Sequence, residues 1–332
     1  MMFELNLNTH DKQTTFDDQR LWDLLIVGGG PAGLNAALYA KRKGLTCALI
    51  AKDFGGQLHN TSEVDNVIGH TLLSGKALSD KYLNHVKTLD VPLLQDVRVL
   101  KITRPNNHFN LLLDDGRTLQ SQTVLIATGG RPRQLGIEGE NTFANKGVSY
   151  CTTCDAPFFK DKHVLVAGGG NSAAEAVIDL SHYAKHITVI HRSQWRADQV
   201  LLDKLDTLTN LTVHLETQLF ALYGEEVMTG ATVLDKSTNT TRNIAADGLF
   251  IEIGTVPISE CVKDLVSQND RGEIIVDGNQ ATSVPGLYAA GDVTDQPFKQ
   301  IIIATAEGAK AALAATQYLN HMTKETNHAK II

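Results

Sequence analysis

The sequence predicts an α/β protein built from two domains of the same kind, and three observations support this. The chain has 332 residues, more than a single compact core usually holds. Two apolar runs, residues 23–27 and 163–167, each resemble a buried parallel strand that ends at three consecutive glycines. Each glycine run precedes a helical stretch and a second apolar strand, and the first glycines lie 140 residues apart. This repeat predicts two Rossmann-like three-layer nucleotide-binding domains.

The first glycine turn, residues 28–33, follows the pattern G-x-G-x-x-G. Residues 34–43 are expected to form the helix after it, and residues 46–50 the next strand. Glycines permit the tight turn and close backbone approach, while the amino end of the helix presents N–H groups to a pyrophosphate. An isolated motif of this kind could be a turn without function, but the strand and helix around it predict a dinucleotide site. Its glycines are Gly28, Gly30 and Gly33.

The stretch that follows offers further candidates for a large cofactor. At the end of the second strand, Lys52 stands where an acid would bind a ribose, with Asp53 one position later, so the ribose contact stays unassigned. A glycine turn at residues 54–58 and the loop around Asn66 are either plain turns or cofactor contacts. Short alternating strands are expected over residues 93–119. A buried strand running into glycines at residues 124–130 suits close cofactor approach.

The second glycine turn, residues 168–173, repeats the first with alanine in the last position. A helix is expected over residues 175–183 and a strand over residues 187–190. After that strand the chain carries Arg192 and Arg196 in place of an acid. These cations are either a solvated basic turn or a site for the extra phosphate of NADP, so we favour NADPH and keep NADH open.

The last third of the chain is expected to return to the first domain. Residues 210–250 read as short antiparallel strands with turns at Gly224 and Gly230, and residues 253–257 as the second crossing between domains. A small-residue strand then ends at Asp292, which either accepts sugar-chain hydroxyls or caps a helix. That helix is expected to begin near Gln300.

A pair of cysteines between the two modules carries the chemistry. Cys151 and Cys154 are separated by two residues, and Asp155 follows them. This spacing allows a small reducible disulfide ring and often lowers the pKa of one thiol. A structural zinc site would need four ligands, usually from a second such pair, and Cys47 and Cys261 stand alone in the sequence. The pair is therefore interpreted as a redox centre, and no metal is assigned.

Composition excludes several classes of function. The net charge is −7 and no run of Lys or Arg occurs, so neither nucleic acid nor an anionic membrane is expected as a partner. The sequence has no apolar run of about 18 residues, the length that would indicate a membrane span. Residues 1–20 read as a flexible segment without the features of a signal peptide. Four cysteines, two of them isolated, suit a reducing cytoplasm.

Together these stretches resemble the low-molecular-weight thioredoxin reductases and, in places more closely, the flavoprotein reductase component of alkyl hydroperoxide reductase. The resemblance covers residues 23–319 and rests on seven motifs in fixed order: VGGGPAG, FGGQL, ATGG, CTTCD, AGGGNSA, AAGDV and KQIIIATAEGAKAAL. The second group carries an additional amino-terminal thioredoxin-like portion, and only some twenty residues precede the first strand here. We therefore expect electrons to pass to a separate protein.

The resemblance implies FAD in residues 21–131 and 256–332, and a nicotinamide nucleotide in residues 132–255, a domain inserted into the first that also carries the cysteine pair. By motif match, FAD would be held by Gly28, Gly30, Gly33, Gln57, Asn66, Thr128, Asp292, Gln300 and Ile301. The nicotinamide nucleotide would be held by Gly170, Asn171, Ser172, Glu175, His191, Arg192 and Arg196. The family carries another arginine where this chain has Ser193, and its loop is one residue longer, which leaves NADPH against NADH open.

The resemblance also implies a reaction and partners. Hydride would pass from NAD(P)H to FAD, and the electrons would then open the Cys151–Cys154 disulfide. Cys154 would lie beside the flavin, Cys151 would attack a disulfide of thioredoxin or a thioredoxin-like protein, and Asp155 would transfer the proton. A homodimer and alternating domain orientations about Gly130 and Gly254 are implied as well. Alternatives are a reductase of a peroxiredoxin system, the same fold fed by ferredoxin or another donor, a flavin oxidase, and a nucleotide sensor without catalysis.

Overall fold

The computed structural model describes residues 16–61 and 63–329, and they fall into two compact units. The first unit comprises the described parts of Met1–His59, Gly75–Gly129 and Pro257–Ile332. The second comprises the described parts of Asn60–Ser74 together with Gly130–Val256. The segment Asn60–Ser74, which the sequence assigns to the first domain, thus groups with the second unit, and most of the N-terminal segment 1–20 lies outside the described residues.

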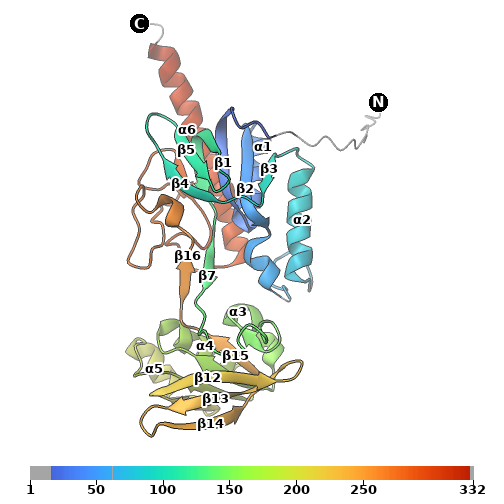
Figure 1. Ribbon diagram of the computed structural model, residues 1–332, viewed down its shortest axis with the longest axis vertical. Coiled ribbons are helices and arrows are strands. Elements are labelled where there is room, and N and C mark those ends of the chain that lie inside the picture. The colour runs from blue at the N-terminus through green and yellow to red at the C-terminus, as the bar shows by residue number, and fades with distance from the viewer. Residues whose placement is uncertain (1–15, 62, 330–332) are drawn as a thin grey trace, which may run out of the picture. The chain divides into compact units, whose positions relative to one another are not determined.

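The first unit is organised around a seven-stranded sheet with the order β3-β2-β1-β6-β5-β4, in which β17 also pairs with β6 (Figure 1). Its central strands β3, β2, β1, β6 and β17 run parallel, and β4 and β5 complete it as antiparallel strands. Because Val27 pairs with both Ile50 and Ile126, the carboxyl ends of the central strands lie together. The strands are β1 (Leu21–Gly29), β2 (Cys47–Phe54), β3 (Leu93–Gln95), β4 (Val99–Thr103), β5 (Phe109–Leu113), β6 (Thr118–Ile126) and β17 (Leu287–Ala289).

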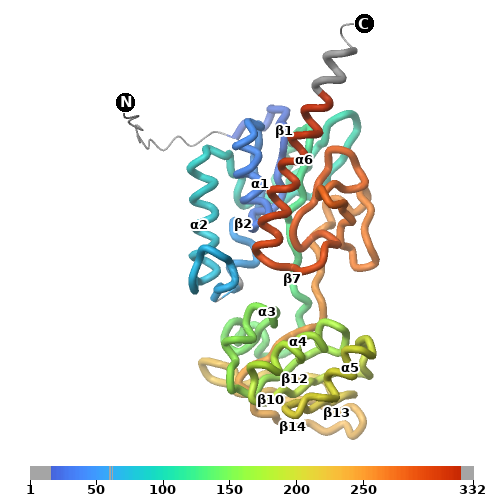
Figure 2. The backbone as a smooth tube through the Cα atoms, turned by 180° about the vertical axis from the view of Figure 1, so that it is seen from behind, coloured from blue at the N-terminus to red at the C-terminus, as the bar shows by residue number. Residues whose placement is uncertain are grey.

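Helices α1 (Pro31–Arg42) and α6 (Ile301–Ala329) pack against each other and against this sheet (Figure 2). Successive side chains of β1 alternate between faces: Leu24 and Ile26 join the core under these helices, and Leu25 and Val27 join a second core on the opposite face. Gly308 of α6 lets the two helices approach closely, because a Cβ there would collide with the carbonyl of Ala32. The unit also contains α2 (Gly75–Lys87), the 3-10 turn η3 (Glu260–Val262), and η1 (Gly56–Asn60) except for its last residue.

The second unit has three layers. Its central sheet is parallel throughout, with the order β11-β10-β9-β15-β8. One apolar core joins this sheet to the helices α4 and α5, and another joins it to the antiparallel sheet β12-β13-β14. The sheet strands are β8 (Val148–Ser149), β9 (His163–Ala167), β10 (His186–Ile190), β11 (Leu211–His214) and β15 (Gly248–Ile251). The other elements are α3 (Thr152–Asp155), η2 (Ala156–Phe159), α4 (Asn171–Ser181), α5 (Gln199–Leu205), β12 (Thr217–Gly224), β13 (Met228–Asp235) and β14 (Thr240–Ala245).

These elements confirm the α/β fold class, and they correct one part of the expectation for residues 210–250. β11 and β15 are parallel members of the central sheet, so only β12, β13 and β14 form antiparallel pairs there. Gly230 lies inside β13 and not in a turn, and a Cβ there would collide with the Tyr223 ring. The crossing near residue 254 is marked by pairing of β16 (Thr255–Pro257) with β7 (Gly130–Pro132).

Candidate functional site

The first glycine turn joins the carboxyl end of β1 to α1, and two of its glycines are required by sterics. Gly28 has φ +118°, a conformation that other residues rarely adopt, and a Cβ there would collide with the carbonyl of Ala127. A Cβ on Gly33 would collide with the carbonyl of Gly28. Gly30 differs from both, because a Cβ there would meet no atom within 4 Å. The turn thus packs tightly against the protein at Gly28 and Gly33 and has free space at Gly30.

This opening fits the pyrophosphate of a dinucleotide. Gly30 is the N-cap of α1, and it makes no side-chain cap hydrogen bond. The first turn of α1 carries no acidic side chain that could accept from its backbone N–H groups, which have no partner within the helix. A helix amino end of this kind attracts an anion through its N–H groups and its dipole.

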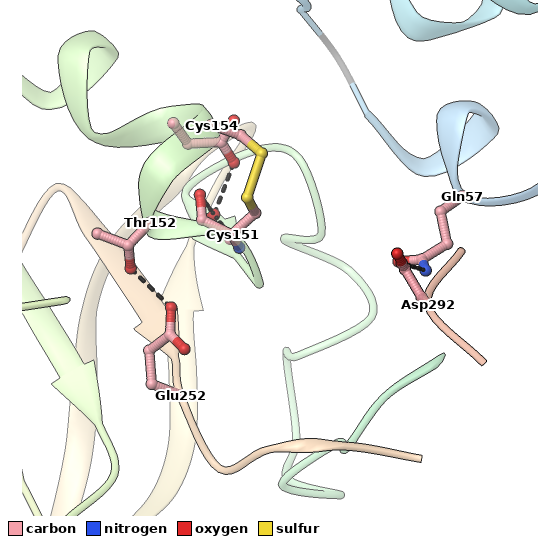
Figure 3. The surroundings of a disulfide bond; sticks show 8 residues. Gln57, Cys151, Thr152, Cys154, Glu252 and Asp292 are labelled. Atoms are coloured by element: carbon pink, nitrogen blue, oxygen red, sulfur yellow. Dashed lines mark hydrogen bonds between the residues drawn. A yellow bond between two sulfur atoms is a disulfide. The ribbon is translucent and has the colours of Figure 1, made fainter. Parts of the chain in front are cut away.

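Asp292 and Gln57 come together although 235 residues separate them. Asp292 follows β17, and its carboxylate Oδ2 accepts a hydrogen bond of 2.9 Å from the Gln57 amide of η1 (Figure 3). Burial raises the pKa of Asp292, while Lys299 and the Gln57 hydrogen bond oppose that rise. Asp292 does not cap a helix, since α6 begins only at Ile301. A half-buried carboxylate at the end of a parallel strand suits an acceptor for ligand hydroxyls.

The remaining residues predicted for FAD have varied surroundings. Thr128, just past β6, donates its hydroxyl to the carbonyl of Ile258 at 2.5 Å. Gln300 precedes α6 and accepts the Ala304 amide with its carbonyl at 2.9 Å, and Ile301 is the first residue of that helix. Asn66 lies in the segment that groups with the second unit, so it is not brought together with the others by the fold of the first unit.

The second glycine turn joins β9 to α4 and repeats the open helix end. Gly168 has φ +156°, and a Cβ there would collide with the carbonyl of Glu252 and crowd Ala173. Gly170 is the N-cap of α4; it makes no side-chain cap hydrogen bond, and a Cβ there would meet nothing within 4 Å. With no acid in the first turn of α4, this end also fits a phosphate group.

The loop after β10 packs on this second turn. The His191 ring is buried and lies where a Cβ of Gly169 would stand, and Arg196 donates its amide to the Gly169 carbonyl at 2.7 Å. Burial and then Arg196 lower the pKa of His191, which favours its neutral form. The side chains of Arg192 and Arg196 are exposed. The structure thus gives His191 a supporting position under the turn and leaves the two cations free to meet a ligand.

The helix residues predicted for the nicotinamide nucleotide are exposed at the start of α4. Ser172 and Glu175 lie on its surface. Asn171 exchanges two hydrogen bonds with Asp198, the N-cap of α5: its amide donates to the carboxylate at 2.8 Å, and its carbonyl oxygen accepts the Asp198 amide at 2.9 Å. Asn171 therefore links the amino ends of α4 and α5 on the face that carries the open turn.

Cys151 and Cys154 form a disulfide with their Cα atoms 5.3 Å apart (Figure 3). Cys151 is the N-cap of α3, and its carbonyl accepts the amides of Cys154 at 3.2 Å and Asp155 at 3.1 Å. Both cysteines are half-buried, so the bridge is partly accessible to solvent. Among the described cysteines, the two others, Cys47 and Cys261, are buried, and burial raises the pKa of each thiol, which makes them inert by comparison.

Asp155 is held beside the disulfide by Ser149. The Ser149 hydroxyl donates to Asp155 Oδ2 at 2.6 Å and accepts the Cys151 amide at 3.1 Å. Burial raises the pKa of Asp155; the Ser149 hydrogen bond lowers it, and the charge of Glu63 adds to the rise. Asp155 also lines a cavity of about 140 Å³ together with Glu63, Ser149 and Lys162. A carboxyl with a raised pKa and access to a polar cavity is suited to hold and release a proton.

Three residues of these sites were missed from the sequence. Ser149 holds Asp155, Glu307 accepts the Gly291 amide at 2.7 Å beside Asp292, and Glu252 accepts the Thr152 hydroxyl at 2.7 Å. Glu252 alone left a signal, since it is an acid at the carboxyl end of an apolar strand. Within the described residues no group of acids, histidines and cysteines is arranged to hold a metal ion, and no helix has the length and apolarity to span a membrane.

Two dinucleotide turns and a half-buried Cys-x-x-Cys disulfide in one chain define a nucleotide-dependent dithiol oxidoreductase. The family model of pyridine nucleotide-disulphide oxidoreductases matches residues 22–308. The chain belongs to this family, which implies FAD and a nicotinamide nucleotide as its cofactors.

Solved structures and curated relatives agree with this assignment. The thioredoxin reductase of Streptococcus pyogenes MGAS5005 superposes with a TM-score of 0.87 at 36% identity, covering 91% of this chain and 99% of that one. The thioredoxin reductase of Giardia duodenalis gives 0.85 at 29% identity, covering 91% and 100%. A Bacillus subtilis protein named NADH dehydrogenase is 42% identical, and the F component of the Staphylococcus aureus alkyl hydroperoxide reductase is 41% identical, each over 305 residues. The chain, 92% of which is covered, spans about 60% of the length of these two relatives.

Proposed function

We propose that the protein is a flavin-dependent disulfide reductase that passes electrons from NAD(P)H to a disulfide of thioredoxin or a thioredoxin-like protein. The observation that carries the proposal is the half-buried Cys151–Cys154 disulfide with Asp155 hydrogen-bonded beside it. A structural disulfide has no need of an acid with a raised pKa, whereas thiol–disulfide exchange requires one proton donor or acceptor. The 36% identity to a thioredoxin reductase over nearly its full length supports the same reaction.

The exchange step can be written for the residues present. Two electrons and two protons reduce the Cys151–Cys154 disulfide: one sulfur becomes a thiol, the other a thiolate, and the second proton is held by a carboxyl of the protein. A thiolate, assigned to Cys151 by the family pattern, attacks the partner's disulfide and forms a mixed disulfide. The second thiol, Cys154, then displaces the partner, which leaves as a dithiol while the Cys151–Cys154 bond forms again. Asp155 takes a proton from the attacking thiol and returns it to the leaving sulfur.

The two open turns would hold the cofactors. Gly28, Gly30 and Gly33 would accommodate the FAD pyrophosphate, with Asp292 and Gln57 accepting and donating at hydroxyls of its sugar chain. Gly170, Asn171 and Ser172 would accommodate the pyrophosphate of the nicotinamide nucleotide. FAD, when bound, accepts a hydride from the nicotinamide nucleotide and supplies two electrons to the disulfide. We further propose that the two units change orientation about Gly130 and Gly254 between these transfers.

For the electron donor we propose NADPH, because Arg192 and Arg196 are exposed cations beside the second turn. NADH is the competing donor, and the name of the Bacillus subtilis relative favours it. The 41% identity to the F component of alkyl hydroperoxide reductase favours a second candidate function, a reductase of a peroxiredoxin system. Both candidates use the same cysteine pair and differ only in the thiol protein that receives the electrons.

Anaerobic stopped-flow of the FAD-loaded protein tests the proposal. We expect rapid bleaching of the flavin by NADPH, and bleaching by NADH alone would reassign the donor. Bleaching by neither would overturn the nicotinamide assignment and point to ferredoxin or another donor. Mixing the reduced protein with oxidised thioredoxin or with an oxidised peroxiredoxin partner then separates the two candidate functions.

The variants Cys151→Ser and Cys154→Ser provide matched controls. Each should keep flavin bleaching and lose disulfide turnover, because neither leaves a pair that can form the disulfide. Turnover of the partner's disulfide by either variant would exclude the pair as the redox centre. We also propose a homodimer in the cytoplasm, which light scattering and fractionation of the native protein test.

A further inference from the structure

Glu252 lies where the second glycine turn meets the segment that carries the cysteines. It follows β15, and its amide donates to the Ala167 carbonyl at the end of β9 at 2.8 Å. Its own carbonyl lies against Gly168, where any Cβ would collide with it. The backbone of Glu252 is therefore fixed at the first residue of the turn that we assign to the nicotinamide nucleotide.

The side chain of Glu252 reaches the cysteine segment. Its Oε1 accepts a hydrogen bond of 2.7 Å from the hydroxyl of Thr152, which is 5% exposed and lies between the two cysteines (Figure 3). The Thr152 backbone also lies close enough to this carboxylate to lower its pKa. The hydroxyl hydrogen bond holds the carboxylate against the short α3 helix. No role in the proposed reaction accounts for this part-buried contact.

We propose that Glu252 is a positioning residue that takes up a proton when the Cys151–Cys154 disulfide is reduced, acting on the pair through Thr152. This inference rests on the proposed dithiol chemistry of the pair. In the oxidised protein the two sulfurs are bonded, and above about pH 7 Glu252 is ionised. Two electrons and two protons then give one thiolate, one thiol and a neutral Glu252 carboxyl. The thiolate adds a negative charge to the turn that holds Thr152, and a like charge nearby favours the neutral carboxyl.

The surroundings of Glu252 place its titration in the physiological range. Burial is the main cause that raises the pKa of Glu252, to about 7. Glu175 and Asp179, both on α4, add to the rise, and the side chain and backbone of Thr152 oppose it. Reduction raises this pKa further. At a pH between the pKa of Glu252 in the oxidised protein and its higher pKa in the reduced protein, reduction therefore adds one extra proton, on Glu252. Below about pH 7 the carboxyl is neutral in both states and contributes nothing.

The test is a redox titration that needs no turnover. The whole protein is equilibrated anaerobically with buffers of reduced and oxidised dithiothreitol between about pH 6 and 9, then acid-quenched, alkylated and analysed by mass spectrometry for the reduced fraction. In the wild-type protein we expect the equilibrium constant for reduction, relative to Glu252→Gln, to fall up to tenfold per pH unit above about pH 7. A flat ratio across this range would overturn the inference, since a purely structural role changes all pH values equally.

Three further variants fix the direction of the effect and guard against misfolding of Glu252→Gln. Asp179→Asn removes an exposed like charge on α4, so the start of the extra pH dependence should move to lower pH. Thr152→Val removes the hydroxyl that stabilises the ionised carboxylate, so the start should move to higher pH, and Thr152→Ser should restore it. If the start moves in neither variant, Glu252 is not the group that titrates.

The outcome is separable from the fate of the proposed function. The dithiothreitol titration could show the extra pH dependence while neither NADPH nor NADH reduces the pair. That result would overturn the proposed electron donor and support the role of Glu252. Normal turnover with NADPH or NADH together with a flat ratio would overturn the role of Glu252 and leave the proposed function in place. Difference infrared spectroscopy adds a direct readout: reduction should produce a protonated carboxyl band in the wild-type protein that Glu252→Gln lacks.

Discussion

The two glycine turns share one sequence pattern, but they close around it differently. In the first turn the last position must be glycine, because a Cβ on Gly33 would collide with the Gly28 carbonyl. In the second turn Ala173 occupies that position and is fully buried, and the preceding Gly168 has φ +156° where Gly28 has +118°. The more extended backbone of the second turn accompanies the room for one methyl group. In these two turns, the last position of the motif holds a side chain where the first glycine has the more extended backbone.

The middle glycines show the other difference. A Cβ on Gly29 would collide with the Asp53 carbonyl at the end of β2, a backbone obstacle. A Cβ on Gly169 would collide with the His191 ring at the end of β10, a side-chain obstacle. At this middle position the first turn packs against backbone, and the second packs against a ring that a substitution can remove. This difference predicts which substitutions each turn can survive.

The largest effect is expected from Gly33→Ala. The new methyl group would press on the Gly28 carbonyl, which the β1–α1 connection cannot move freely, so a loss of about 3 kcal/mol in the free energy of unfolding is expected. FAD should no longer co-purify. Thermal unfolding and flavin absorbance measure the two effects. Gly30→Ala is the control: its methyl group meets no protein atom within 4 Å, so the apoprotein should stay folded while FAD binding weakens. Equal unfolding of both variants would contradict the steric account.

Gly169→Ala should have the next largest effect and spare the first site. The methyl group displaces the buried His191 ring and the loop attached to Gly169 by Arg196, at a cost of about 1–3 kcal/mol. We expect FAD to be retained and the affinity for the nicotinamide nucleotide to fall, as followed by flavin bleaching. The double variant Gly169→Ala/His191→Ala removes the obstacle and should regain much of the lost stability. Additive losses in the double variant would show that the ring is not the obstacle.

The strand ends beside the two turns differ in charge, and this difference sets the third prediction. Near the end of β2, Lys52 pairs with Asp96 at 3.6 Å. Arg192 and Arg196 follow β10 as exposed cations, and among the described residues no carboxylate lies within salt-bridge distance of them. If they meet the extra phosphate of NADPH, replacing either by Ala should raise the KM for NADPH about tenfold and leave that for NADH unchanged. Lys204→Ala removes an exposed cation of the same unit and is the control. An equal loss with both nucleotides would exclude the phosphate contact.

Local sequence pattern predicted those parts of the molecule whose structure depends on residues close to one another in the sequence. The strand–turn–helix units around Gly28 and Gly168 and the start of α6 at Ile301 follow from apolar runs and glycine positions, and the structure confirms them. Local pattern also predicted the strands between residues 93 and 126, because each carries its own apolar run.

The parts that could not be predicted depend on contacts between distant residues. Thr152 and Glu252 lie 100 residues apart, and the raised pKa of Glu252 exists only because folding buries it next to that threonine. Ser149 belongs to a strand of two residues that is defined by pairing with β15, so periodicity gave no signal for it. The parallel direction of β11 and β15 was missed for the same reason: direction is set by the neighbouring strand and not by the strand's own residues.

The smallest effect is expected from Ala173→Gly, which gives the second turn the sequence pattern of the first. If the opened backbone at Gly168 is an intrinsic property of this turn, the variant only loses a buried methyl group and gains a flexible residue in α4, at about 1–2 kcal/mol. Chemical denaturation should show this loss with little change in the affinity for the nicotinamide nucleotide. If instead the methyl group of Ala173 holds Gly168 open, the turn should close towards the geometry of the first, and the affinity should change more than the stability. The ratio of the two effects therefore decides whether the glycine or the alanine determines the shape of the turn.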